Sequence, residues 1–167
     1  FNRPIVIDSG LAGTAFFCSG NTNGTTQTYN GNISGSGTFH RGVDGQPQVG
    51  GGTTILNGNN SYLGQTRVYD GTLVVNGAIS NSWVIVHTNA TLAGNGIISG
   101  FVQITQGATL SPGTSVGRLN IYSLSLYPGS TTVMEVNGST NDLISGLNHL
   151  DLAGTLVISN LGPAFVA

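Results

Sequence analysis

The chain has 167 residues, a formal net charge of −2, and charged side chains at only 6% of its positions. Its four cations are arginines scattered along the chain, so there is no basic cluster to neutralise several phosphates, and an electrostatic nucleic-acid binder is excluded. Gly, Thr, Asn and Ser together supply almost half of the chain while strong helix formers are scarce, which excludes an all-helical domain.

Apolar residues recur in short runs, far below the roughly 18 to 20 needed for a membrane-spanning helix, so we expect no membrane insertion by this segment. The first residues carry neither an initiator Met nor a signal peptide, and we expect an excised or processed piece. Cys18 is the one cysteine, which leaves no intrachain disulfide and no cysteine-based metal site.

Residues 1–50 fit no strict period and are predicted to form irregular rungs and a loop. The stretch 1–7 indicates an early or edge strand, since Pro4 suits an edge. The stretch 19–28 is almost wholly polar and is typical of a loop, while Ile33 and Phe39 favour one rung. The glycines at 50–52 are expected to lead into the regular part.

Residues 51–167 are predicted to be regular repeats of the same continuous domain, cut off within a rung at the carboxyl end. A small residue followed by Thr-Leu recurs at nearly equal intervals, and the last of these intervals is long enough for two repeats. Turn pairs such as Asn76-Gly77 and Asn95-Gly96 separate short strands, and we expect them to supply left-handed backbone. A sandwich of hairpins is the alternative, but it needs no such period, whereas stacked parallel coils do.

The sequence therefore predicts an all-β parallel β-helix, or β-solenoid, with about 18–23 residues per rung. Stacking would place equivalent apolar residues in one inward ladder, each contributing roughly 1.5 to 3 kcal/mol, beside an outward threonine column. The predicted ladder is Leu73, Leu92, Leu110, Val133 and Leu156. We expect Leu92→Asp to be far more damaging than Asp70→Ala.

The segment 56–75, with its spaced Leu, Gly, Asn, Tyr and Thr and its closing Gly71-Thr72-Leu73, resembles the autotransporter-associated β-strand repeat. Residues 94–100 with 107–113 look like the next element, and 142–144 with 152–158 resemble the repeat that closes such passengers. The resemblance implies a right-handed parallel β-helix that is extracellular or displayed at the cell surface.

Chemistry-bearing residues are few. Asp142, His149 and Asp151 form a weak polar cluster, either an acid/base or metal patch or, as we favour, a solvated turn; His40, Arg41 and Asp44 form a similar one. No nucleophile elbow, dinucleotide loop or calcium nonapeptide occurs, so no catalytic residue, cofactor or metal is predicted.

Exposed aromatic rings with neighbouring Asn and Thr side chains are suited to binding sugars. The candidate ligand surface is Tyr62, Tyr69, Trp83, Tyr122 and Tyr127, although Trp83 can instead be half core.

These observations predict a non-enzymatic extracellular segment that serves as a stalk, display scaffold or adhesive module of a larger exported bacterial protein. One alternative is a β-helix that binds or cleaves polysaccharides. Another is a module that self-associates into fibres through its open ends. The expected partners are glycans, a host or cell surface, or further copies of the chain.

Overall fold

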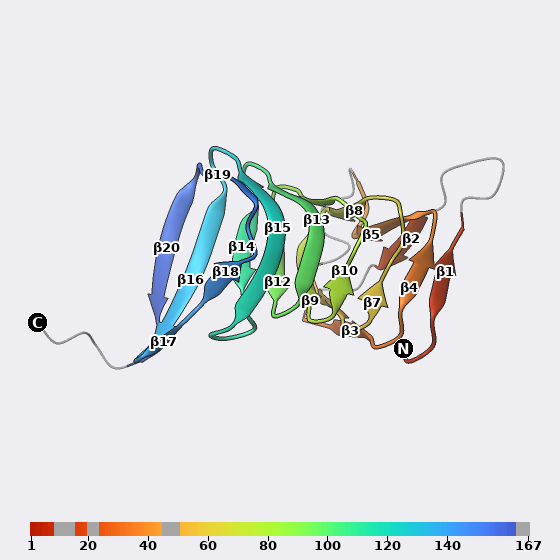
Figure 1. The fold of residues 1–167 in the computed structure, drawn as a ribbon, viewed down its shortest axis with the longest axis horizontal. Coiled ribbons are helices and arrows are strands. Elements are labelled where there is room, and N and C mark those ends of the chain that lie inside the picture. Colours follow the sequence, from red (N-terminus) through yellow and green to blue (C-terminus); the bar gives the residue numbers. More distant parts are fainter. Residues whose placement is uncertain (9–15, 20–23, 45–50, 163–167) are drawn as a thin grey trace, which may run out of the picture.

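The computed structural model describes residues 1–8, 16–19, 24–44 and 51–162. Its strands follow one another along the long axis in chain order, from β1 at one end to β20 at the other, so each turn of the chain adds length to a rod (Figure 1). No helix in these ranges is long and apolar enough to cross a bilayer. The predicted polar loop over 19–28 is wrong at both ends, because Ser19 and residues 26–28 lie in strands, while residues 20–23 lie outside the described ranges. Gly50 and the expected break within the last rung also lie outside these ranges.

Two parallel sheets run along this rod in the described part of the chain. The ten-stranded sheet contains β2 (Phe16–Ser19), β5 (Thr38–Arg41), β7 (Asn59–Asn60), β8 (Thr66–Val68), β10 (Ala78–Ile79), β11 (Val84–Val86), β13 (Ile97–Ile104), β15 (Arg118–Leu126), β18 (Leu143–Ser145) and β19 (His149–Asp151). The eight-stranded sheet contains β3 (Thr26–Tyr29), β6 (Thr53–Leu56), β9 (Gly71–Val75), β12 (Ala90–Gly94), β14 (Thr109–Pro112), β16 (Thr131–Asn137), β17 (Thr140–Asn141) and β20 (Thr155–Asn160). The strands β1 (Ile5–Ile7) and β4 (Ile33–Gly35) form a separate parallel pair.

Successive coils supply successive strands of each sheet, and they pair in parallel, as in β6 with β9 and β9 with β12. The short strand β17 folds back antiparallel onto β16. The predicted all-β parallel solenoid is therefore confirmed.

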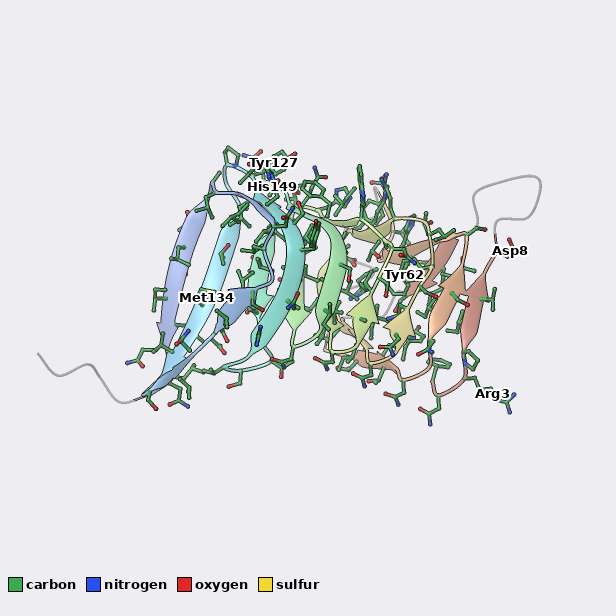
Figure 2. All side chains as sticks on the ribbon, in the orientation of Figure 1. Arg3, Asp8, Tyr62, Tyr127, Met134 and His149 are labelled. Atoms are coloured by element: carbon green, nitrogen blue, oxygen red, sulfur yellow. The ribbon has the colours of Figure 1, made fainter. Side chains whose placement is uncertain are left out.

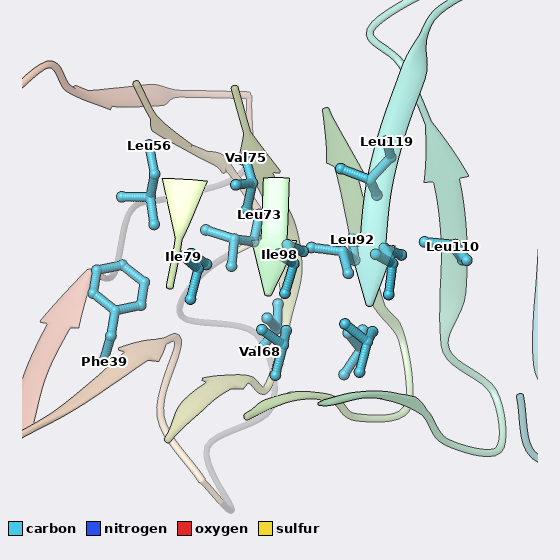
Figure 3. Close-up of a cluster of buried hydrophobic side chains, with 14 of the residues drawn as sticks. Phe39, Leu56, Val68, Leu73, Val75, Ile79, Leu92, Ile98, Leu110 and Leu119 are labelled. Carbon is cyan, nitrogen blue, oxygen red and sulfur yellow. The ribbon is translucent and has the colours of Figure 1, made fainter. Parts of the chain in front are cut away.

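The inward column of the eight-stranded sheet brings together Leu73, Leu92 and Leu110, all fully buried. The prediction of Val133 is wrong by one position: Leu110 pairs with Thr132, and because alternate side chains of a strand point to opposite faces, Val133 leaves the column. Leu156 pairs with Thr132 and continues the column, but it is 63% exposed because no described coil packs beyond it. Figure 3 shows Leu73, Leu92 and Leu110 following one another along the core.

The residue before each of these positions faces outward, and the register joins a threonine from every coil into one column. Its members are Thr26, Thr53, Thr72, Thr91, Thr109, Thr131 and Thr155. The intervals between them are unequal: the step from Thr91 to Thr109 is the shortest, and the step from Thr26 to Thr53 is the longest. The strands therefore stay in register while the connections change length.

Asn-Gly pairs mark one corner of successive coils, and the reason for the glycine differs from the expected one. Gly77 and Gly96 do not adopt left-handed backbone. Instead, a Cβ at Gly77 would lie 2.1 Å from the carbonyl oxygen of Gly58, and one at Gly96 would lie 2.2 Å from that of Gly77. Close approach of stacked backbones, not a positive φ, requires glycine here.

The asparagines at this corner form a side-chain ladder along the rod. Asn57 Nδ2 donates to Asn30 Oδ1 at 2.7 Å, and Asn76 Nδ2 donates to Asn57 Oδ1 at 3.2 Å. Asn30 Nδ2 in turn donates to Asn2 Oδ1 at 2.7 Å. Hydrogen bonds between identical side chains thus hold neighbouring coils in register where the main chain turns.

Candidate functional site

The outer face of the ten-stranded sheet carries a chemically diverse surface. Because β5, β8, β11 and β13 are adjacent, their outward residues His40, Arg67, Ile85 and Gln103 fall into one column. Aromatic side chains flank this column on both sides. We call this surface the aromatic face; it consists of His40, Gln65, Arg67, Tyr69, Trp83, Ile85, His87, Phe101, Gln103 and Tyr127, all half-buried or exposed.

On one side of the column, the rings of Tyr69 and His87 stack along the rod axis and contact His40 of the column. The ring of His87 lies parallel to that of Tyr69, with centroids 4.6 Å apart, and His40 meets Tyr69 edge to face at 5.4 Å. Arg67 donates from Nε and Nη2 to Gln65 Oε1 and from Nη1 to the Tyr69 hydroxyl at 3.2 Å. The guanidinium thus fixes the tyrosine that joins the two histidines.

On the other side of the column, Trp83 directly precedes β11 and stands opposite Phe101 of β13 in the register. Their rings are T-shaped, with centroids 5.9 Å apart, and Trp83 is 58% exposed. Further along the rod, and on the same side of the column as Tyr69 and His87, the Tyr127 hydroxyl accepts from the Gln103 amide at 3.0 Å, and Tyr127 is 43% exposed.

The two histidines of the face are uncharged at neutral pH. Partial burial lowers the pKa of His40 and of His87 below the ordinary histidine value, and the nearby positive charge of Arg67 lowers both further, while Asp44 opposes this effect. The Nε2 atom of His87 is buried and has no hydrogen-bond partner. At pH 7 the aromatic face therefore carries Arg67 as its fixed charge.

The predicted ligand surface is divided by the structure. Tyr69, Trp83 and Tyr127 lie on the aromatic face, but Tyr62 does not: its ring is buried against Phe39, with centroids 6.1 Å apart. The Tyr62 hydroxyl pairs with Thr66 at 2.5 Å, and burial raises its pKa well above the usual range. Tyr62 is thus a core residue, and Figure 2 shows it among the strands, with Tyr127 near the margin of the molecule.

Trp83 and Tyr122 differ from what the flanking residues suggested. Trp83 is not half core: it lies one position before the buried Val84, so it faces outward by alternation. Tyr122 is 52% exposed, but it lies where β13 and β15 lose regular register, and no ring contact in the described part of the chain joins it to the aromatic face.

The predicted polar cluster is also divided. His149 Nε2 and Asp151 Oδ2 lie 3.0 Å apart on β19, both exposed, and the hydrogen bonds from His149 and from Ser125 lower the pKa of Asp151. Asp142 is buried and accepts instead from the main-chain N–H groups of Gly117 and Glu135, at 2.8 and 2.7 Å. The expected approach of Asp142 to the pair is therefore wrong: it ties a loop to β16. Within the described ranges no three His, Cys, Asp or Glu side chains are placed to hold a metal ion.

Sequence reasoning missed the buried ion pair between Arg41 and Asp70. Arg41 is fully buried, and its Nη1 lies 2.9 Å from Asp70 Oδ1 while Nη2 donates to the Gly52 carbonyl. It also missed His40, Arg67 and His87 as neighbours. The step from His40 to Arg67 is longer than the period of the regular repeats, so only the strand register could have aligned them.

The last described coil exposes apolar side chains. A cavity of about 550 Å³ there is lined by leucines together with Met134 and Thr132, whose hydroxyl has no hydrogen-bond partner. Leu152, Leu156 and Ile158 are 75%, 63% and 55% exposed. These side chains are the counterparts of residues that the next coil covers elsewhere in the rod.

No family model matches the chain. Its sequence is 42% identical, over 164 aligned positions, to the adhesin BmaC autotransporter of Brucella suis biovar 1 (strain 1330). The alignment covers 83% of this chain, and the chain spans only 4% of the length of that adhesin. This similarity, together with the parallel solenoid, confirms the predicted resemblance to autotransporter passenger repeats.

Proposed function

We propose that this chain is a rigid, non-catalytic adhesive segment of an exported protein displayed at the bacterial surface. The observation that carries the proposal is a continuous parallel solenoid whose sequence relative is named an autotransporter adhesin. Rigidity follows from the stack: each interior leucine is covered above and below, and backbone hydrogen bonds join every coil to the next.

In this proposal the rod extends a binding surface away from the cell, and successive coils repeat that surface. Each coil advances the rod by about 4.8 Å, the spacing of neighbouring strands, so a run of coils holds a binding surface away from its point of attachment. The buried charged groups of the described part have partners inside the rod: Arg41 pairs with Asp70, and Asp142 accepts from two main-chain N–H groups. The outer faces are left to make contacts.

The test is adhesion of beads coated with the purified chain to cultured epithelial cells. We expect coated beads to bind and beads carrying Leu92→Asp, which disrupts the core, to lose binding. Incubation with plant and bacterial polysaccharides should release no reducing ends. Equal adhesion by coated and uncoated beads would contradict the adhesive role, and released sugars would favour the polysaccharide-cleaving alternative.

A further inference from the structure

We propose that the aromatic face binds uncharged oligosaccharides. This inference rests on the proposed adhesive function and gives it a ligand class. It is argued from exposed rings, from hydrogen-bonding groups left open between them, and from the charge of the face.

The aromatic rings of the face are both accessible and held in place. Trp83 and Tyr127 are 58% and 43% exposed, whereas Tyr62 is in the core, so the chain can bury an aromatic ring where packing needs it. Phe101 supports the Trp83 indole edge to face, and the Gln103 amide binds the Tyr127 hydroxyl. Rings oriented before binding lose little conformational freedom when the face of a sugar packs on them.

Polar groups between the rings keep unused hydrogen-bonding capacity. Gln65 uses Oε1 to accept from Arg67, which leaves its Nε2 amide to donate outward. Gln103 uses Nε2 to donate to Tyr127, which leaves its Oε1 to accept. Sugar hydroxyls both donate and accept, so a ligand lying over these amides can satisfy both groups.

The hydrogen bonding of the face suits uncharged sugars better than acidic ones. The Arg67 guanidinium is already bonded to Gln65 and to the Tyr69 hydroxyl, so it is not presented as an open fork for a carboxylate. His40 and His87, on either side of Tyr69, are neutral at pH 7. An anionic sugar would therefore find no open bidentate cation here to offset the loss of its hydration.

The geometry requires several sugar units. Trp83 stands in the register opposite Phe101 and Ser123, and Tyr127, which directly follows β15, lies four residues beyond Ser123 and two coils further along the rod. With about 4.8 Å between coils and about 3.3 Å per residue along a strand, the two rings are about 10 Å apart along the axis and about 13 Å across it. A ligand must be an oligosaccharide to contact both.

The test uses Trp83 as its reporter, because it is the one tryptophan in the chain. The chain is screened on a glycan array and then titrated with the neutral hexasaccharides that bind, with oligogalacturonate as the acidic probe. We expect a change in tryptophan fluorescence on binding and little dependence on salt. Calorimetry should show affinity at least about tenfold lower for Trp83→Ala and for Tyr127→Ala, with unchanged thermal midpoints. Tyr122→Ala, a matched exposed aromatic outside the face, should bind like the parent chain.

Three results would overturn the assignment: no neutral glycan binds, Trp83→Ala binds as tightly as the parent chain, or oligogalacturonate binds better and loses affinity in salt. The bead assay separates this failure from that of the proposed function. If Trp83→Ala beads adhere as well as parent beads, the adhesive segment stands and the aromatic face is not its site. If parent beads do not adhere although sugars bind, the adhesive role fails and the sugar site stands.

Discussion

Gly77 shows how closely successive coils approach at their corners. An added Cβ would meet the Gly58 carbonyl oxygen at 2.1 Å and the Asn57 carbonyl oxygen at 2.5 Å, and because both are backbone atoms they have little freedom to move away. We therefore expect Gly77→Ala to destabilise the fold by about 1–3 kcal/mol, the usual cost of overpacking. Urea unfolding should show this loss, while Ser80→Ala, at an exposed position nearby, should change stability little. Equal midpoints for both variants would contradict the close approach.

Asp70 is the second residue whose replacement should be costly. The sequence suggested that Asp70→Ala would be mild, but its carboxylate neutralises the fully buried Arg41. Removing one partner leaves a buried charge uncompensated, which typically costs about 3–5 kcal/mol. Chemical denaturation should show a loss of this size for Asp70→Ala and almost none for Asp44→Ala, whose side chain is exposed. A mild effect of Asp70→Ala would show that water reaches Arg41.

At the scale of elements, the ring stack of His40, Tyr69 and His87 joins β5, β8 and the end of β11. Because the pKa of both histidines is lower in the folded chain than in the unfolded one, the unfolded chain binds more protons below about pH 6.5. Stability is therefore full above that pH and falls as the pH drops towards the folded-state pKa values.

Thermal midpoints measured between pH 7.5 and 5 should fall in the parent chain and fall less in His87→Phe, which keeps a ring on Tyr69 without titrating. Tyr122→Phe, at an exposed ring outside the stack, is the control and should keep the parent slope. If His87→Phe showed the same pH dependence as the parent, the stack would not be the source of it.

The elements also show which features the sequence could predict. The Thr-Leu steps located β9, β12, β14 and β20 because a fixed side chain must fill the same place in every coil. The step to β16 could not be placed to the residue, since Thr132 and Val133 both fit a β pattern and a longer connection precedes them. The aromatic face was only partly predictable because its members come from strands whose spacing varies from coil to coil.

For the whole molecule, the cost of a buried charge should depend on the position of the coil. Leu92 has a coil on each side and is fully buried, whereas Leu156 lies at the open end and is 63% exposed. We expect Leu92→Asp to cost more than about 4 kcal/mol and Leu156→Asp less than about 1 kcal/mol in the monomer. Differential scanning calorimetry at low protein concentration compares the two variants. Similar losses would mean that the end is covered in solution.

The overall architecture was predictable because it depends on one repeated demand, the burial of like residues in register. The function of the rod was harder to predict, because the residues on its outer faces need not repeat from coil to coil. Trp83 and Tyr69 directly flank strands and face outward by alternation, whereas Tyr62 lies in the connection between β7 and β8 and is buried, a difference that the sequence does not show.

The unequal intervals in the threonine column have one more consequence. The coil from Thr131 to Thr155 is longer than the coil from Thr91 to Thr109, yet both present the same strand positions, so the additional residues are absorbed between the strands. In such a scaffold the stacked strands provide the stability, and the connections between them can vary. Residues can therefore be inserted into a connection without changing the register of the strands. Homologous rods can therefore differ in their surface connections while keeping the same stack of strands. For the same reason, an epitope can be grafted into one of these connections.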